Sequence, residues 1–222
     1  ESVKLRLVAY NIKHGRGMDN KVDLRRIASV LRKLKPDLVA LQEIDHTCTR
    51  SGNVDQAAVL GDLLGMHHRF GTFMDFQGGQ YGLAILSRLP IQKSIRHQLA
   101  PGAEPRCALE VTVQPTNDSP LFSLVSIHND WTREAFRVAQ VNDLIAGLKE
   151  RKHPVILAGD FNAEPKAESL ARLSASGFLI LPKKNNAKTF PSPSPRVEID
   201  YFIHYEIICW PFMHSLWPCP KT

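Results

Sequence analysis

Four short, mostly apolar segments each run into a polar residue suited to phosphate or metal chemistry. The segments and the residues that follow them are 7–10 with Asn11, 38–42 with Glu43, 124–127 with His128, and 155–159 with Asp160. A glutamate is a hard oxygen ligand suited to Mg²⁺, and aspartate or histidine side chains can move protons. Because α/β folds bind ligands beyond the ends of rigid, buried strands, we expect these side chains to share a site.

One further residue, Asp200, extends this set. Asp200 lies inside the apolar segment 199–203, where an unpaired charge would be costly, so we expect it to have a partner. Taken singly, each residue has a simpler interpretation: Asp160 with Asn162 as an Asx-turn, His128 as a hydrogen-bonded histidine near the surface, Asp200 as a structural ion-pair member, and Glu43 as a solvated side chain. Five such positions in strands favour a shared site.

The elements that would position these residues alternate between strands and helices. Apolar residues at helical spacing predict helices over 24–34, 56–64 and about 133–149; Pro36 stops the first and Gly65 ends the second. Strands are predicted over 3–10, 38–41, 81–86, 108–113, 121–127, 155–158 and 199–203. This interleaving indicates a layered α/β architecture.

The motifs that carry these residues resemble those of the endonuclease/exonuclease/phosphatase superfamily. They are YNIKHG with Asn11, LVALQE with Glu43, YGLAILSR with Tyr81 and Gly82, VSIHND with His128, ILAGDFNAEP with Asp160 and Asn162, and EIDYFI with Asp200. LQE and GDFN, in this order, are specific together, and the resemblance covers Lys4 to about Ile203. It implies a four-layer α/β/β/α sandwich of two mixed sheets flanked by helices. We expect residues 1–222 to form one such domain, with an atypical C-terminal tail from about residue 204.

The resemblance also implies a role for each residue. Glu43 would hold Mg²⁺, with Mn²⁺ or Ca²⁺ as alternatives, and Asn11 would hold that carboxylate or a metal-bound water. Asp160 would orient or deprotonate the attacking water, and Asn162 would donate a hydrogen bond to a non-bridging phosphate oxygen. His128 would contact the phosphate and could act as an acid.

Arg106, His14 and Asp45 are additional candidates. Arg106, in EPRCALEV, could add a guanidinium to the same phosphate, but a surface arginine at the start of a strand is an equally good interpretation. His14 and Asp45 could support Asn11 and Glu43, although loop polarity explains them as well.

The end of the chain departs from the superfamily pattern. Most members carry a Ser-Asp-His triplet after the last core strand, whose histidine is paired by the aspartate that matches Asp200. Here the chain after Ile203 reads HYEIICWPFMHSLWPCPKT, and its only late histidines are His204 and His214. Three interpretations are open: an altered or truncated C-terminus, a tail that supplies a histidine in a divergent way, or a binding-only relative with a damaged site.

We therefore predict a Mg²⁺-dependent hydrolase of phosphate esters. A phosphodiesterase is favoured, either nuclease-like or acting on a lipid or sugar. The alternative is a catalytically impaired phosphate-binding or interaction module that retains the fold. The expected partner is a phosphate-ester substrate, with nucleic acid and membrane lipid as candidates, and we expect a monomer. Segment 73–76, before Gly78-Gly79, could form a hairpin tip that contacts lipid, or its two phenylalanines could pack in the core.

The composition is that of an ordinary globular protein. The modest positive net charge favours anionic partners. Of its 222 residues 43% are hydrophobic, and 28 Lys and Arg against 22 Asp and Glu give a net charge of +6. The four cysteines have no C-x-x-C spacing, which argues against a zinc ribbon or a dense disulfide framework. The chain begins at Glu1 rather than Met, which would fit a removed signal peptide and export to the periplasm or outside the cell, with the compartment otherwise open.

Overall fold

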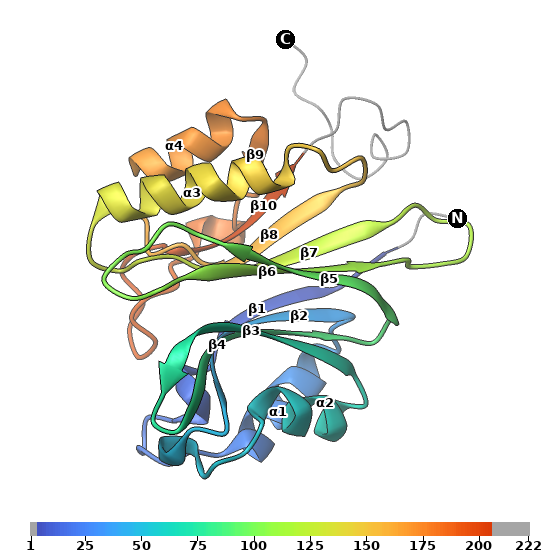
Figure 1. Ribbon diagram of the computed structural model, residues 1–222, viewed down its shortest axis with the longest axis vertical. Coiled ribbons are helices and arrows are strands. Elements are labelled where there is room, and N and C mark those ends of the chain that lie inside the picture. The colour runs from blue at the N-terminus through green and yellow to red at the C-terminus, as the bar shows by residue number, and fades with distance from the viewer. Residues whose placement is uncertain (1–3, 206–222) are drawn as a thin grey trace.

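Two β-sheets stack face to face in the computed structural model, which describes residues 4–205 (Figure 1). Helices α1 (Leu24–Leu34) and α2 (Gln56–Leu64) cover the outer face of the four-stranded sheet. Helices α3 (Glu134–Leu148) and α4 (Glu168–Ala175) cover the outer face of the six-stranded sheet. The predicted four-layer α/β/β/α sandwich is therefore confirmed.

Both sheets are mixed. The four-stranded sheet has the order β1 (Leu7–Asn11), β2 (Leu38–His46), β4 (Gly79–Ser87) and β3 (His67–Phe76), with β1 parallel to β2 and the other pairs antiparallel. The six-stranded sheet has the order β5 (Ile91–Gln98), β6 (Cys107–Val113), β7 (Phe122–His128), β8 (Val155–Asp160), β10 (Asp200–Tyr205) and β9 (Phe178–Ile180), in which only the pair β7 and β8 is parallel.

Local sequence explains where the helices begin and end. Asp23 and Asp55 cap α1 and α2 by accepting hydrogen bonds from the backbone N–H groups of Arg26 and Ala58. Gly65 ends α2 with a left-handed φ of 65°, as its sequence predicted. Three short 3-10 helices lie in the connections: η1 (Lys13–Gly15), η2 (Thr49–Ser51) and η3 (Lys184–Asn186).

Apolar side chains fill three spaces between the four layers. One cluster lies between the two sheets, a second between the four-stranded sheet and α1 and α2, and a third between the six-stranded sheet and α3 and α4. Each layer thus buries its apolar face against a neighbour, and this holds the strand ends in fixed positions. Within residues 4–205, no helix is both long and apolar enough to cross a membrane.

The sequence patterns missed three strands and one helix. Strands β3, β5 and β9 and helix α4 were not predicted, and β2 extends to His46, well past its predicted end. The first two missed strands, HHRFGTFMDF and IQKSIRHQ, lie at sheet edges and carry exposed polar side chains. An edge strand with a solvated face lacks the continuous apolar run that indicates a buried strand.

Candidate functional site

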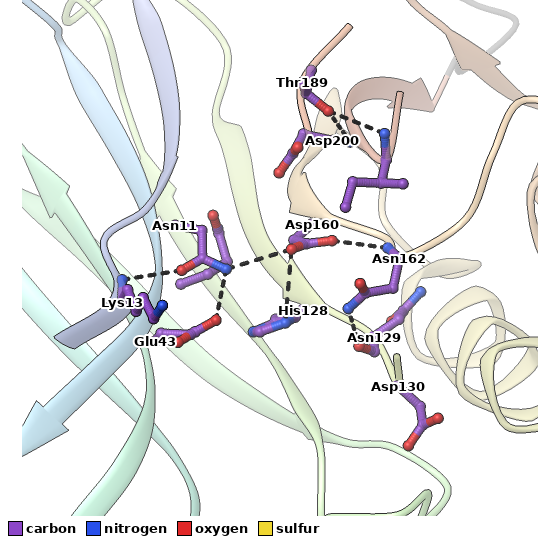
Figure 2. A network of polar contacts seen from close by, with 12 residues as sticks. Asn11, Lys13, Glu43, His128, Asn129, Asp130, Asp160, Asn162, Thr189 and Asp200 are labelled. Atoms are coloured by element: carbon purple, nitrogen blue, oxygen red, sulfur yellow. Dashed lines mark hydrogen bonds and ion pairs between the residues drawn. The ribbon is translucent and has the colours of Figure 1, made fainter. Parts of the chain in front are cut away.

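Strand register places three of the predicted residues in a row on the six-stranded sheet. His128 is paired with Asp160 across the parallel strands β7 and β8, and Asp200 is paired with Asp160 across the antiparallel strands β8 and β10. Paired residues on neighbouring strands project from the same face of a sheet. The His128 Nε2 atom accordingly lies 3.8 Å from Asp160 Oδ2 (Figure 2).

The facing sheet contributes Asn11 and Glu43. Asn11 ends β1, and its Nδ2 atom donates hydrogen bonds to Glu43 Oε1 at 2.9 Å and to Asp160 Oδ2 at 3.4 Å (Figure 2). The prediction that Glu43 follows the end of its strand was wrong. Glu43 lies within β2, in a bulge between Gln42 and Ile44, with a φ of 58°. The bulge explains how a residue in mid-strand is directed toward the opposite sheet.

Close contacts hold the two sheets together just behind this group. Gln42 Nε2 donates to Ser126 Oγ at 3.1 Å, and Ser126 Oγ donates to the carbonyl of Leu41 at 3.2 Å. Gly159 has a φ of +139°, and a Cβ atom there would lie 2.3 Å from the carbonyl oxygen of Ile127 and 2.6 Å from Gln42 Nε2. The glycine of the GDFN motif is therefore required for the sheets to approach each other.

Asp160 is buried among other acidic groups. Burial, followed by the charge of Asp200, raises the pKa of Asp160 to about 7, although hydrogen bonds from Asn162 N and Asn11 oppose the rise. The Asn162 bond, 2.9 Å to Asp160 Oδ1, is the Asx-turn that the sequence allowed. Burial also raises the pKa of Asp200. The site thus gathers more negative charge than its own donors neutralise.

This excess of negative charge would favour a bound metal cation, so the residues can be compared with the ligands that such an ion needs. Among residues 4–205, no group of three or more His, Cys, Asp or Glu side chains is arranged to hold a metal ion. A metal enclosed by protein ligands is therefore not supported by the described residues. Mg²⁺ keeps several of its waters and needs only one or two carboxylates, so the partly exposed Glu43, held by Asn11, fits this ion.

Arg106 is the largest fully buried side chain of the described chain. It is only 1% exposed, so the interpretation as a surface arginine was wrong. Its Nη2 atom lies 3.1 Å from Glu104 Oε2, and its guanidinium lies 4.8 Å from the centre of the Phe73 ring. Within the described chain, the Nε and Nη1 atoms have no hydrogen-bond partner. Because unpaired buried donors are unfavourable, these two atoms are suited to bind an anion.

His128 is a neutral imidazole in this environment. Burial and then the charge of Arg106 lower the pKa of His128 to about 3. Its Nδ1 atom has no hydrogen-bond partner among the described residues. Burial, followed by the charge of Glu43, raises the pKa of the nearby Tyr81 phenol. Both rings therefore offer uncharged hydrogen-bond donors beside the guanidinium of Arg106.

Comparison with known proteins agrees with this geometry. Residues 8–213 match the model of the Endonuclease/Exonuclease/phosphatase family. The chain belongs to this family. Members of the family are hydrolases that act on phosphate esters. None of the curated protein sequences matches the chain.

Solved structures share the fold. An endonuclease/exonuclease/phosphatase from Beutenbergia cavernae superposes with a TM-score of 0.73 at 22% identity, over 90% of this chain and 64% of that one. The chain thus spans less than two thirds of that protein. The catalytic domain of human nocturnin with bound sulfate gives a TM-score of 0.69 at 23% identity, over 91% and 83%. A mannosyl-6-phosphatase from Bacteroides thetaiotaomicron gives 0.67 at 17%, over 91% and 85%.

Asp200 meets different neighbours from those implied by the family pattern. A hydrogen bond from Thr189 and the charge of Lys183 oppose the rise in its pKa that burial causes. The Lys183 ammonium also donates to the Asp200 carbonyl and to Glu198 Oε1, the latter at 2.5 Å. These groups offset the burial of Asp200 only in part, because its pKa remains raised.

His204 does not occupy the place of the family's terminal histidine. It lies four residues after Asp200 in β10, opposite Ile156 in β8, so the strand carries it about 13 Å from the site. His214 and the tail aromatics, Trp210, Phe212 and Trp217, lie outside the described residues.

Asp45 lies two residues after Glu43 in β2, opposite Tyr81 of the β3–β4 hairpin. Asp45 is fully buried and accepts two hydrogen bonds from Arg50, at 2.7 and 2.8 Å. The Arg50 guanidinium lies 4.5 Å from the ring centre of Phe76 and 5.2 Å from that of Tyr81. Phe73 is buried and the partly buried Phe76 packs against the cluster between the sheets, in agreement with the interpretation that these phenylalanines pack.

Sequence reasoning missed Asp130, which immediately follows His128 and Asn129. Its side chain is fully buried and accepts four hydrogen bonds. The only signal was its position in the VSIHND motif, where an aspartate before a helix reads as an ordinary cap.

Proposed function

We propose that this chain is a Mg²⁺-dependent hydrolase of phosphate esters, with a phosphodiester as its preferred substrate class. One observation carries the proposal: Asn11 joins Glu43 to Asp160, Asp160 lies beside His128, and Arg106, which has two unpaired donors, is near enough for its charge to lower the pKa of His128. Carboxylates that favour a cation thus oppose donors that favour an anion. A phosphate ester accompanied by a hard divalent cation satisfies both sides.

In this proposal the protein groups mainly position the substrate and the attacking water, and stabilise the charge that develops on the phosphate. Arg106, His128 and Asn162 would donate hydrogen bonds to the non-bridging oxygens of the phosphate. Asp160 would orient the attacking water and accept its proton as the new P–O bond forms and the bond to the leaving oxygen breaks. Mg²⁺ at Glu43 would polarise a phosphoryl oxygen and neutralise developing charge. Mn²⁺ or Ca²⁺ could occupy the same oxygen site.

The first experiment measures hydrolysis of bis(p-nitrophenyl) phosphate with Mg²⁺, with Mn²⁺, with Ca²⁺ and after chelation with EDTA. We expect turnover that needs the metal, and a Glu43→Gln variant whose half-saturating Mg²⁺ concentration rises about tenfold or more, since loss of one charged ligand removes at least about 1.4 kcal/mol. Glu150→Gln, at an exposed position, is the matched control and should behave as wild type. Turnover that survives EDTA would contradict the metal requirement.

Arg106→Lys should raise the KM for the same diester. Lysine keeps the charge but loses the planar fork whose Nε and Nη1 atoms are unpaired, and one charge-assisted hydrogen bond contributes about 1.5–3 kcal/mol. The expected loss in kcat/KM is therefore about tenfold to 100-fold. Arg172→Lys, which changes an exposed arginine, is the control. Equal kinetics of Arg106→Lys and wild type would exclude a phosphate contact.

A binding module without catalysis is the second candidate. It is favoured by the surroundings of Asp200, where Thr189 and Lys183 oppose the rise in pKa that burial causes. Folded, Mg²⁺-loaded protein that binds inorganic phosphate but hydrolyses neither the diester nor mannose 6-phosphate would establish this alternative. The sugar phosphate is included because one structural relative is named a mannosyl-6-phosphatase.

A further inference from the structure

The two carboxylate oxygens of Asp130 bind different parts of the chain. Oδ1 accepts hydrogen bonds from Thr132 N at 2.7 Å, Thr132 Oγ1 at 2.6 Å and Arg133 N at 3.1 Å, and so closes the turn before α3. Oδ2 accepts a hydrogen bond at 2.7 Å from the backbone N–H of Ala103, which is 27 residues away in the chain. Closing the turn therefore needs only Oδ1, and Oδ2 serves the segment 99–106.

A second buried side chain joins the same two segments. Gln140, in α3, is fully buried; its Oε1 atom accepts from the backbone N–H of Asp130 at 2.9 Å, and its Nε2 atom donates to the carbonyl of Ala100 at 3.2 Å. The approach of the segments is close, because a Cβ atom at Gly102 would lie 2.3 Å from Asp130 Oδ2. Asp130 and Gln140 thus act together as a brace between segment 99–106 and the turn after β7.

Each braced segment leads directly to a donor of the candidate site. Segment 99–106 ends at Arg106, and the turn follows His128 by one residue. Between them, Asn129 N donates to the carbonyl of Asp160 at 3.0 Å, and the Asn129 carbonyl accepts from Asn162 Nδ2 at 3.0 Å. The turn is therefore fixed to the GDFN motif on one side, through the bond between Asn129 and Asn162 (Figure 2), and to segment 99–106 on the other.

Burial of this carboxylate is compensated by its four donors. Burial alone would raise the pKa of Asp130, but hydrogen bonds from Thr132, Ala103 and Arg133 lower it below the ordinary value. Asp130 is consequently ionised at neutral pH, and the bond from Ala103 is charge-assisted. Such bonds are stronger than neutral ones and fix geometry more firmly.

We propose that Asp130 is a positioning residue that, with Gln140, sets the Arg106 guanidinium relative to His128 and Asn162 so that the three groups can bind one phosphate. The inference rests on the proposed function, because the phosphate is the ligand that the three donors share. It assigns to Oδ2 a role in the site that a helix cap would not have.

Two variants break the brace from opposite sides. In Asp130→Asn, the amide oxygen can keep the three donors of the turn, while the amide NH₂ would face the Ala103 N–H, so the bridge is lost and the cap is retained. In Gly102→Ala, the added methyl group would collide with Oδ2 and push segment 99–106 away without changing Asp130. Glu134→Gln is the control: Glu134 also lies at the start of α3, but it bonds to Arg137 and Ser169 and not to segment 99–106.

The measurements are the Kd for inorganic phosphate by calorimetry in Mg²⁺, the KM and kcat for the diester, and the Tm. We expect Asp130→Asn and Gly102→Ala to raise the Kd and KM about tenfold, the effect of losing one charged hydrogen bond, with a smaller change in kcat. Glu134→Gln should change only the Tm. In an Arg106→Lys background, Asp130→Asn should add less than about a further threefold loss, because both changes remove the same contact.

Phosphate binding within about twofold of wild type in folded Asp130→Asn or Gly102→Ala would overturn the proposal, as would losses that multiply fully with Arg106→Lys. If Asp130→Asn does not fold, Gly102→Ala decides alone. Wild-type protein that binds phosphate but does not hydrolyse the diester would contradict the proposed catalysis and leave this test intact.

Discussion

Asp160→Asn is expected to lower kcat for the diester by about 10²–10⁴, the range typical of losing a general base. Its fold should nevertheless be no less stable than that of the wild type. Burial and the neighbouring Asp200 raise the pKa of Asp160 to about 7, so its charge destabilises the folded state. That cost begins above the ordinary value of 3.8 and is complete above about pH 7. A neutral asparagine avoids the cost and keeps an oxygen for the Asn162 N–H.

The two effects are measured separately, as kcat in Mg²⁺ and as Tm above neutral pH in metal-free buffer. Asp143→Asn, an exposed change on α3, is the matched control and should alter neither. A Tm well below that of the wild type would show that the Asp160 charge stabilises the fold, contrary to our interpretation. Unchanged kcat would remove Asp160 from the mechanism.

Glu110→Gln should lower the free energy of unfolding by about 3–5 kcal/mol, the effect of breaking a buried ion pair. Glu110 lies in β6 and is 1% exposed. It accepts two hydrogen bonds from Arg151, at 2.7 and 2.8 Å, and one at 2.8 Å from Ser123, and it lies 2.7 Å from His97 Nε2. The variant leaves the Arg151 charge without its partner. This cluster joins β5, β6, β7 and the segment after α3.

The pH dependence of this loss gives a second check. Burial opposes ionisation of Glu110, but hydrogen bonds from Arg151, His97 and Ser123 prevail and lower its pKa to about 2. The stabilisation from its charge is therefore complete above the ordinary value of 4.5 and is lost as the pH falls toward about 2. Urea denaturation of both proteins should show a difference that shrinks over this window.

Glu168→Gln is the control for that measurement, because Glu168 forms an exposed pair with Arg172, and such pairs contribute about 0–1 kcal/mol. If Glu110→Gln is as mild as this control at neutral pH, the buried cluster does not stabilise the fold.

Local patterns in the sequence determined the central elements and the chemical types at the site. Helices α1, α2 and α3 and strands β4, β6, β7, β8 and β10 were predicted, because an element buried on one or both faces carries a periodic or continuous apolar signal. The placement of Asn11, His128 and Asp160 at strand ends followed from the same signal. Edge strands β3 and β5 were missed because their solvated faces conceal it.

Only the tertiary structure decided which polar side chains are buried and what they contact. The bond from Asn11 to Asp160 joins residues 149 positions apart, and that from Ala103 to Asp130 joins residues 27 apart. No local pattern encodes such pairs, since they depend on how layers stack after each strand has formed. For the same reason, the sequence alone could not distinguish a surface Arg106 from the fully buried guanidinium whose Nε and Nη1 atoms have no hydrogen-bond partner among the described residues.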